Sequence, residues 1–254
     1  MGQAGDQERP ASVSVSASVP APAPALAPVP DGEADLALYL RPGFYIDSDE
    51  PSVAAFARER AGDAATPAAR AVRLYYAVRD ELPYDPYDID LTPQGFRASR
   101  CLAAGRGFCI TKAGLLAAAA RSLGVPARVG FADVRNHLAT ARLRQMMGTD
   151  VFYYHGYAEL YLDGRWVKAT PAFNIELCRK FRVRPLEFDG RHDSIFHPFD
   201  ADNRRHMEYV AERGFYADIP FAEIEHIFRT YYPGLVKAGP SGDFAAEAAA
   251  ERGA

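Results

Sequence analysis

Apolar residues recur at helical spacing in three segments of the first half of the chain. The spacing predicts one helix that begins near Pro51, a second over Ala68–Leu82, and a third that begins at Cys109 and stops at Gly124. A glycine just past the last apolar position is a common helix stop because it tolerates a left-handed backbone. Leu36–Leu40, a shorter apolar run, is predicted as a strand.

Alternating apolar and polar residues predict a β-hairpin in the second half. Tyr153–Leu162 and Arg165–Ala172 flank Asp163-Gly164, a preferred two-residue turn. Pairing across this turn sets Leu162 opposite Arg165, Tyr161 opposite Trp166 and Glu159 opposite Lys168. The aromatic pair and the opposite-charge pair favour this register. In it, His155 and Thr170 lie on the same face as diagonal neighbours. Ala127–Val134 is predicted as a further strand.

Helices followed by a hairpin predict an α+β fold, with an antiparallel sheet packed on the helix that begins at Cys109. Residues 1–33 are rich in Pro, Ala, Ser and Val and are predicted to be a disordered tail. Residues 34–236 are expected to form one domain, with short helical pieces at His206–Arg213 and Phe221–Tyr232 near its end. The Gly-, Ala- and Glu-rich residues 237–254 are predicted to be a loose tail or a marginal helix.

Composition narrows the class of protein. The 254 residues are 48% hydrophobic, enough for a sizeable core, and the net charge of −4 offers no basic surface for nucleic acid. A membrane span is not expected because no run of about 18 apolar residues occurs. The apolar stretch at 11–30 is broken by Ser and Pro, whereas an export signal has a continuous apolar region. An export signal is therefore not expected there. Three cysteines do not make a disulfide framework, so reduced thiols and a cytoplasmic location are expected.

Cys109 stands out because it opens a helix. The first turn of a helix carries unpaired N–H groups and about half a positive charge, which favours a thiolate. Arg106 and Lys112 are close in sequence and are expected to add to this effect. The alternative is that Cys109 is a small buried apolar residue, as free cysteines usually are. Cys101 and Cys178 lack the helix-start context and are predicted to be structural.

Two segments carry a family resemblance. GRGFCITKAGLLAAAARSLGVPARVGFADV resembles the cysteine motif of the transglutaminase-like superfamily, and HGYAELYLDGRWVKATP resembles its histidine motif; together they cover residues 101–174. The resemblance implies a papain-like fold with the cysteine helix packed on an antiparallel sheet. It also implies that Cys109 is the nucleophile and His155 its base. The imidazole would take the thiol proton and return it to the leaving amine.

The third catalytic position departs from the family pattern. Thr170 stands where the resemblance implies an aspartate, and a hydroxyl can accept from an imidazole N–H but cannot stabilise imidazolium by charge. Asn174 is an alternative third member by analogy with papain-like enzymes. Gln94 is, by the same analogy, a candidate side-chain donor to the oxyanion, beside the backbone N–H of Cys109. Plain strand, turn and loop roles are the alternatives for Thr170, Asn174 and Gln94.

Other chemistries have weaker support. His192, Asp193, His197 and Asp200 have the residue types of metal ligands, but their irregular spacing favours a solvated loop, and no metal or cofactor is predicted. Two functions follow from the sequence. The first is thiol-dependent acyl transfer or amide hydrolysis through a cysteine thioester, acting on a peptide or protein amide with water or an amine as acceptor. The second is a catalytically weakened or inactive fold that binds peptides or proteins in its cleft.

Overall fold

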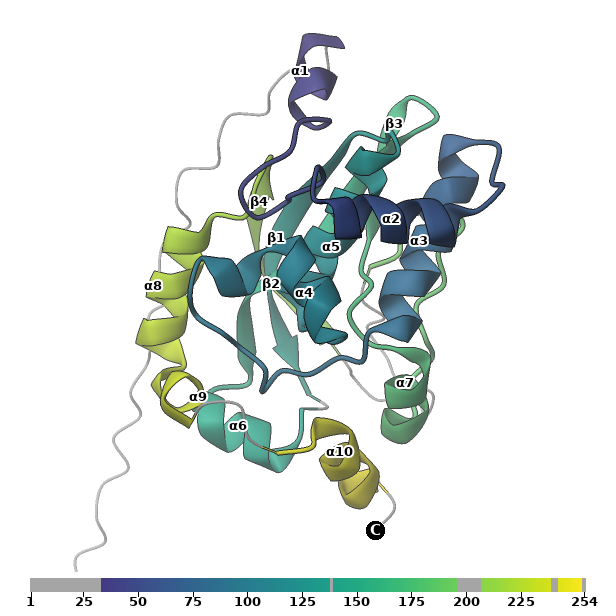
Figure 1. The fold of residues 1–254 in the computed structure, drawn as a ribbon. Helices are drawn as coiled ribbons and strands as arrows, with labels where there is room; N and C mark the ends of the chain where they lie inside the picture. Colours follow the sequence, from purple (N-terminus) through teal and green to yellow (C-terminus); the bar gives the residue numbers. More distant parts are fainter. Residues whose placement is uncertain (1–32, 138, 196–206, 239–241, 253–254) are drawn as a thin grey trace, which may run out of the picture.

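The computed structural model describes residues 33–137, 139–195, 207–238 and 242–252 (Figure 1). Its helices are α1 (Glu33–Leu38), α2 (Pro51–Ala61), α3 (Pro67–Glu81), α4 (Ala98–Ala104), α5 (Cys109–Ser122), α6 (Ala141–Met147), α7 (Ile175–Phe181), α8 (Phe221–Tyr231), α9 (Pro233–Ala238) and α10 (Phe244–Arg252). A short 3-10 helix, η1, covers Gln94–Phe96. The strands are β1 (Ala127–Asn136), β2 (Val151–Leu162), β3 (Arg165–Ala169) and β4 (Met207–Tyr216). Of the tail predicted at 1–33, all but Glu33 lies outside the described residues.

The four described strands form one antiparallel sheet in the order β3-β2-β1-β4. Helix α5 packs on β1 and β2, and α2, α3 and α4 contact α5 (Figure 1). The α+β fold with the cysteine helix against an antiparallel sheet is therefore confirmed. The predicted hairpin register is also confirmed, because Leu162 pairs with Arg165, Tyr161 with Trp166 and Glu159 with Lys168.

Helix α5 is the centre of the core. It is buried from Cys109 to Arg121, and its small side chains let the neighbouring helices and strands approach closely. Its start is fixed locally by Thr111, whose Oγ1 accepts from the Phe108 N–H at 3.1 Å. Past its end, Gly124 has a φ of +78°, the left-handed conformation predicted for the helix stop.

Two predicted elements are wrong. Leu36–Leu40 is not a strand, because Glu33–Leu38 form α1. A short apolar run is compatible with either a helix or a strand, so the sequence pattern did not decide between them. Tyr39 follows α1, packing edge-on against Trp166 at 5.0 Å. The helical piece predicted at His206–Arg213 is wrong as well, because pairing with β1 makes Met207–Tyr216 a strand. Helix formers such as Glu208 and Glu212 are overridden there by the tertiary context.

The structure also defines the end of the predicted hairpin and the conformation of the C-terminal residues. Strand β3 stops at Ala169 rather than Ala172, since the Thr170 N–H donates to Ser194 instead and Pro171 has no N–H. Of the two alternatives for the C-terminal residues, the structure has a helix. In α10, the Phe244 ring lies 5.5 Å from the Phe181 ring of α7. No helix within the described ranges is long and apolar enough to cross a membrane.

Candidate functional site

The start of α5 touches β2 directly at Gly156. A Cβ on Gly156 would lie 2.9 Å from Cα of Ile110 and 3.4 Å from the carbonyl oxygen of Cys109, so only glycine fits this approach. Cys109 is the first residue of the helix, and His155 immediately precedes Gly156 on the strand. The close contact therefore brings the strand that carries His155 against the end of the helix that carries the thiol.

A buried ion pair fixes the backbone on the other side of His155. Tyr154 has a φ of +55°, a left-handed conformation that is uncommon for a residue other than glycine. Its N–H donates to Oδ1 of Asp133 at 3.1 Å, and Asp133 also accepts from Nε of Arg213 at 2.9 and 3.0 Å. The pairing of β1 with β2 shifts register at this point. Asp133 and Arg213 thus hold an irregular strand in which His155 is the next residue.

Cys109 and His155 line the same small pocket, of about 30 Å³. Both side chains are buried, with 7% and 2% of their surface exposed. Apolar residues from the loop before η1 and from α6, β2, α8 and α9 supply much of the rest of the wall: Ile89, Leu143, Met147, Phe152, Phe228 and Leu235. Tyr232, after α8, joins this wall to β2, since its hydroxyl accepts from the Tyr153 N–H at 2.5 Å and donates to the Val151 carbonyl at 3.0 Å.

Burial raises the pKa of the Cys109 thiol to about 11, although backbone N–H groups of Gly156, Ile110 and Cys109 act in the opposite direction. The predicted thiolate at the helix start is therefore not the resting form, because the loss of hydration outweighs the N–H groups. The two predicted cationic neighbours have other partners. Arg106 is exposed and donates to Asp88 at 3.0 Å, and Lys112 is buried among carbonyl groups.

This pKa leads to a prediction about thiol reactivity. At pH 8, Cys109 in the folded protein is expected to react with iodoacetamide at least about 100-fold more slowly than in the urea-unfolded chain, because only the thiolate attacks. The folded rate should keep rising above pH 9, toward the raised pKa of about 11. Peptide mapping of the alkylated protein measures each thiol separately. A rate that levels off below pH 7 would instead show a resting thiolate and contradict the structure.

Lys112 anchors the segments around the site. Its ammonium, fully buried one turn into α5, donates to the carbonyls of Arg79 at 3.0 Å, Leu82 at 2.6 Å and Ala172 at 2.8 Å. Burial lowers its pKa to about 7. Two of the carbonyls belong to the end of α3, where backbone oxygens lack intrahelical partners. This role differs from the electrostatic effect on the thiol that the position of Lys112 in the sequence predicts.

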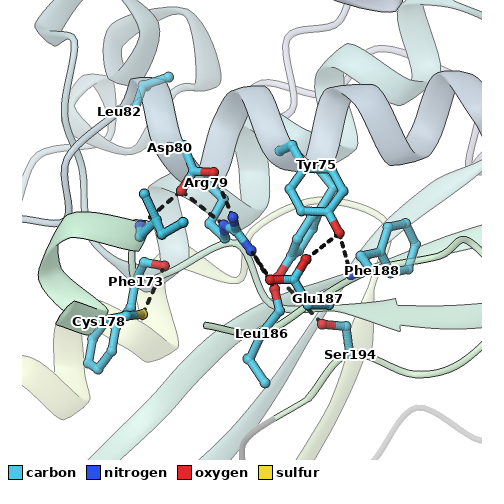
Figure 2. A network of polar contacts seen from close by, with 12 residues as sticks. Tyr75, Arg79, Asp80, Leu82, Phe173, Cys178, Leu186, Glu187, Phe188 and Ser194 are labelled. Atoms are coloured by element: carbon cyan, nitrogen blue, oxygen red, sulfur yellow. Dashed lines mark hydrogen bonds and ion pairs between the residues drawn. The ribbon is translucent and has the colours of Figure 1, made fainter. Parts of the chain in front are cut away.

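Helix α3 holds the chain after β3 in a second network (Figure 2). Arg79 donates to the Leu186 carbonyl at 2.7 Å and pairs with Asp80 at 2.7 Å, while Asp80 accepts from the Ile175 N–H at 2.9 Å. Tyr75 donates to the Leu186 carbonyl at 2.8 Å. Figure 2 shows these side chains reaching from one helix to both ends of the 173–194 segment. The segment that follows Thr170 is therefore tied to the same helix as Lys112.

The structure places the remaining predicted site residues differently. Thr170 is buried, and its Oγ1 finds no hydrogen-bond partner among the residues described, so no bond to His155 is formed. Oδ1 of Asn174 accepts from the Tyr84 N–H at 3.1 Å, and Tyr84 lines the pocket, which puts Asn174 one residue away from it. Gln94 is exposed on η1 and does not line the pocket, so the structure does not bring it to Cys109.

The other cysteines and the histidine-rich loop lie apart from the pocket. Cys101 and Cys178 are free, buried and outside its lining. His192 pairs with Asp189 at 2.7 Å, and Asp193 accepts from the Lys168 N–H at 2.9 Å, whereas His197 and Asp200 lie outside the described residues. Within the described part of the chain, no three His, Cys, Asp or Glu side chains gather as metal ligands do.

Comparisons with known proteins give one family match and two similar structures. Two solved structures are similar: a putative cysteine protease from Cytophaga hutchinsonii, at 19% identity and a TM-score of 0.44, and a putative protease from Parabacteroides distasonis, at 16% identity and a TM-score of 0.34. The similarity covers 72% and 54% of this chain, which spans 54% and 25% of the two proteins. No curated protein matches. The model of the transglutaminase-like superfamily matches residues 54–171. The matched segment contains both Cys109 and His155.

Proposed function

We propose that the protein is a cysteine-dependent enzyme that transfers an acyl group from a peptide or protein amide, through a thioester on Cys109, to water or to an amine. One observation carries the proposal: Cys109 and His155, both within the segment that the transglutaminase-like model matches, line a single pocket. A thiol and an imidazole in one pocket are the parts that covalent acyl transfer requires.

The raised thiol pKa determines how the first step proceeds. Cys109 is protonated at rest, so its proton passes to His155 as the sulfur attacks the amide carbon. The C–N bond then breaks, the imidazolium returns the proton to the departing amine, and the acyl group stays on sulfur as a thioester. In the second step, His155 takes a proton from water or an amine, which attacks the thioester and releases Cys109 as a thiol. The backbone N–H of Cys109, at the helix start, supports the oxyanion.

A second function is favoured by the third catalytic position. Because the Thr170 hydroxyl has no partner among the described residues and carries no charge, it does not stabilise an imidazolium. This supports a catalytically weakened or inactive fold that uses the same pocket to bind a peptide or protein. The two functions differ in turnover, which the binding role lacks.

Turnover and the acceptor are tested together. Incubating the protein with N-acetyl-aminoacyl-aminomethylcoumarin amides, with and without a fluorescent primary amine, is expected to release aminomethylcoumarin. A free acid as product, unaffected by the amine, identifies a hydrolase. An acyl–amine conjugate identifies a transferase. Release from none of the donors by protein of intact fold would contradict the proposal and leave the binding role.

A further inference from the structure

The pocket at Cys109 is almost entirely apolar. None of the residues that line it is Asp, Glu, Lys or Arg, and His155 is its one histidine. A charged group placed there would lose its hydration without gaining an ion pair, which costs several kcal/mol. The lining therefore selects against charged groups on whatever enters the pocket.

The pocket is also small. A cavity needs about 10–15 Å³ to hold one water molecule. The volume of about 30 Å³ therefore corresponds to about two groups the size of a water molecule. Two such groups correspond to a side chain between alanine and valine.

The walls are built so that they do not spread easily. Helix α9 meets α6 at Gly234, where a Cβ would lie 2.4 Å from the Met146 carbonyl oxygen, so the two backbones are in direct contact. The Tyr232 hydroxyl ties the chain between α8 and α9 to β2 through Val151 and Tyr153. Both links must break before the pocket widens on the side of α8 and α9.

Covalent chemistry decides which part of a substrate occupies this space. In a thioester the acyl group is bonded to the Cys109 sulfur and stays at the pocket that Cys109 lines, while the amine departs. The group next to the reacting carbonyl must therefore fit the apolar walls. This argument rests on the proposed function, because it assumes that Cys109 forms the thioester.

We propose that the acyl donor carries a small aliphatic side chain on the carbon next to the reacting carbonyl, and that Met147 of α6 and Phe228 of α8 set its upper size. Both side chains are buried and line the pocket. Met146, the preceding residue on α6, does not line it and is the matched control.

The test is kcat/KM for N-acetyl-X-aminomethylcoumarin with X as Ala, Val, Leu, Phe, Asp or Lys. For the unaltered protein, Ala and Val are expected to exceed Phe, Asp and Lys by at least about tenfold, a ratio within reach of pocket fit. Met147→Ala is expected to move the optimum to Leu or Phe by a similar factor, and Met146→Ala to keep the original order. Phe228→Leu is a second enlarging variant, on another wall, should Met147→Ala not fold.

The outcomes separate this inference from the proposed function. Equal rates for all six donors, a preference for Asp or Lys, or the same change of order in Met146→Ala and Met147→Ala would overturn the inference while turnover stands. Absence of release from all six donors, with the fold intact by circular dichroism, would overturn the proposed function and the inference with it.

Discussion

Replacing Cys109 with alanine is expected to abolish release of aminomethylcoumarin from every acyl donor, down to the rate in buffer. The variant removes the one atom that forms the thioester, and no neighbouring thiol replaces it, because Cys101 and Cys178 do not line the pocket. The fold should survive, since alanine keeps the small size of a residue at the first position of α5. A change of about 1 kcal/mol in the free energy of unfolding would shift the melting temperature by only about 2–4 °C.

Cys101→Ala is the matched control for this loss. Cys101 is also buried and free, and its pKa is likewise raised to about 11 by burial, so it resembles Cys109 in these three properties but does not line the pocket. It is expected to retain full turnover. Loss of turnover in Cys101→Ala together with normal turnover in Cys109→Ala would show that the nucleophile has been assigned to the wrong cysteine.

Replacing His155 with alanine is expected to lower the single-turnover rate of acylation by about 10²–10⁴-fold, the usual contribution of a general base. The effect should be largest near neutral pH. A thiol whose pKa is raised to about 11 is almost fully protonated there and depends on the imidazole for its deprotonation. At higher pH the deficit should shrink, since hydroxide increasingly supplies the thiolate without a base.

His192→Ala is the control for this variant. The His192 side chain is 83% exposed and pairs with Asp189, away from the pocket. Its removal is expected to leave both the acylation rate and the pH profile unchanged. An acylation rate in His155→Ala within about twofold of the original, at neutral pH, would fall well outside the range for a general base and remove His155 from the mechanism.

The parts of the site that local pattern determines were predictable. The start of α5 at Cys109 and its stop at Gly124 follow from helical spacing, and the Asp163-Gly164 turn sets the hairpin register that carries His155. These features depend on residues close together in the sequence. The two family motifs are also short, continuous segments, so both could be recognised from the sequence.

The parts that depend on burial were not predictable. The helix start of Cys109 indicates a thiolate, but the direction of its pKa is decided by burial of the pocket, to which α8 and α9 contribute far along the chain. Lys112 looks like a cation available to the thiol, yet it is fully buried and binds three carbonyls. These partners of Lys112 come together only when α3 and α5 pack against the chain after β3.

The ion pair that supports the strand next to His155 left one signal in the sequence, a carboxylate in a buried strand. Asp133 lies in a strand that is buried along most of its length, and it pairs with Arg213 of β4, in a segment that was predicted to be helical. A carboxylate within a strand that is buried along most of its length requires a partner, so Asp133 could have been marked as a structural ion pair from its position alone. Its partner could not, because the pairing of β4 with β1 brings them together.

The most direct test of the mechanism is to trap the acyl-enzyme. The protein is mixed with the N-acetyl-Ala or N-acetyl-Val donor, quenched in acid within one turnover, and analysed by intact and peptide mass spectrometry. We expect an acetyl-aminoacyl adduct on the peptide that contains Cys109, formed at least about 100-fold more slowly in His155→Ala and absent from Cys109→Ala. An adduct on another residue, or turnover of the donor without any adduct on Cys109 in a quench that preserves a synthetic thioester, would contradict it.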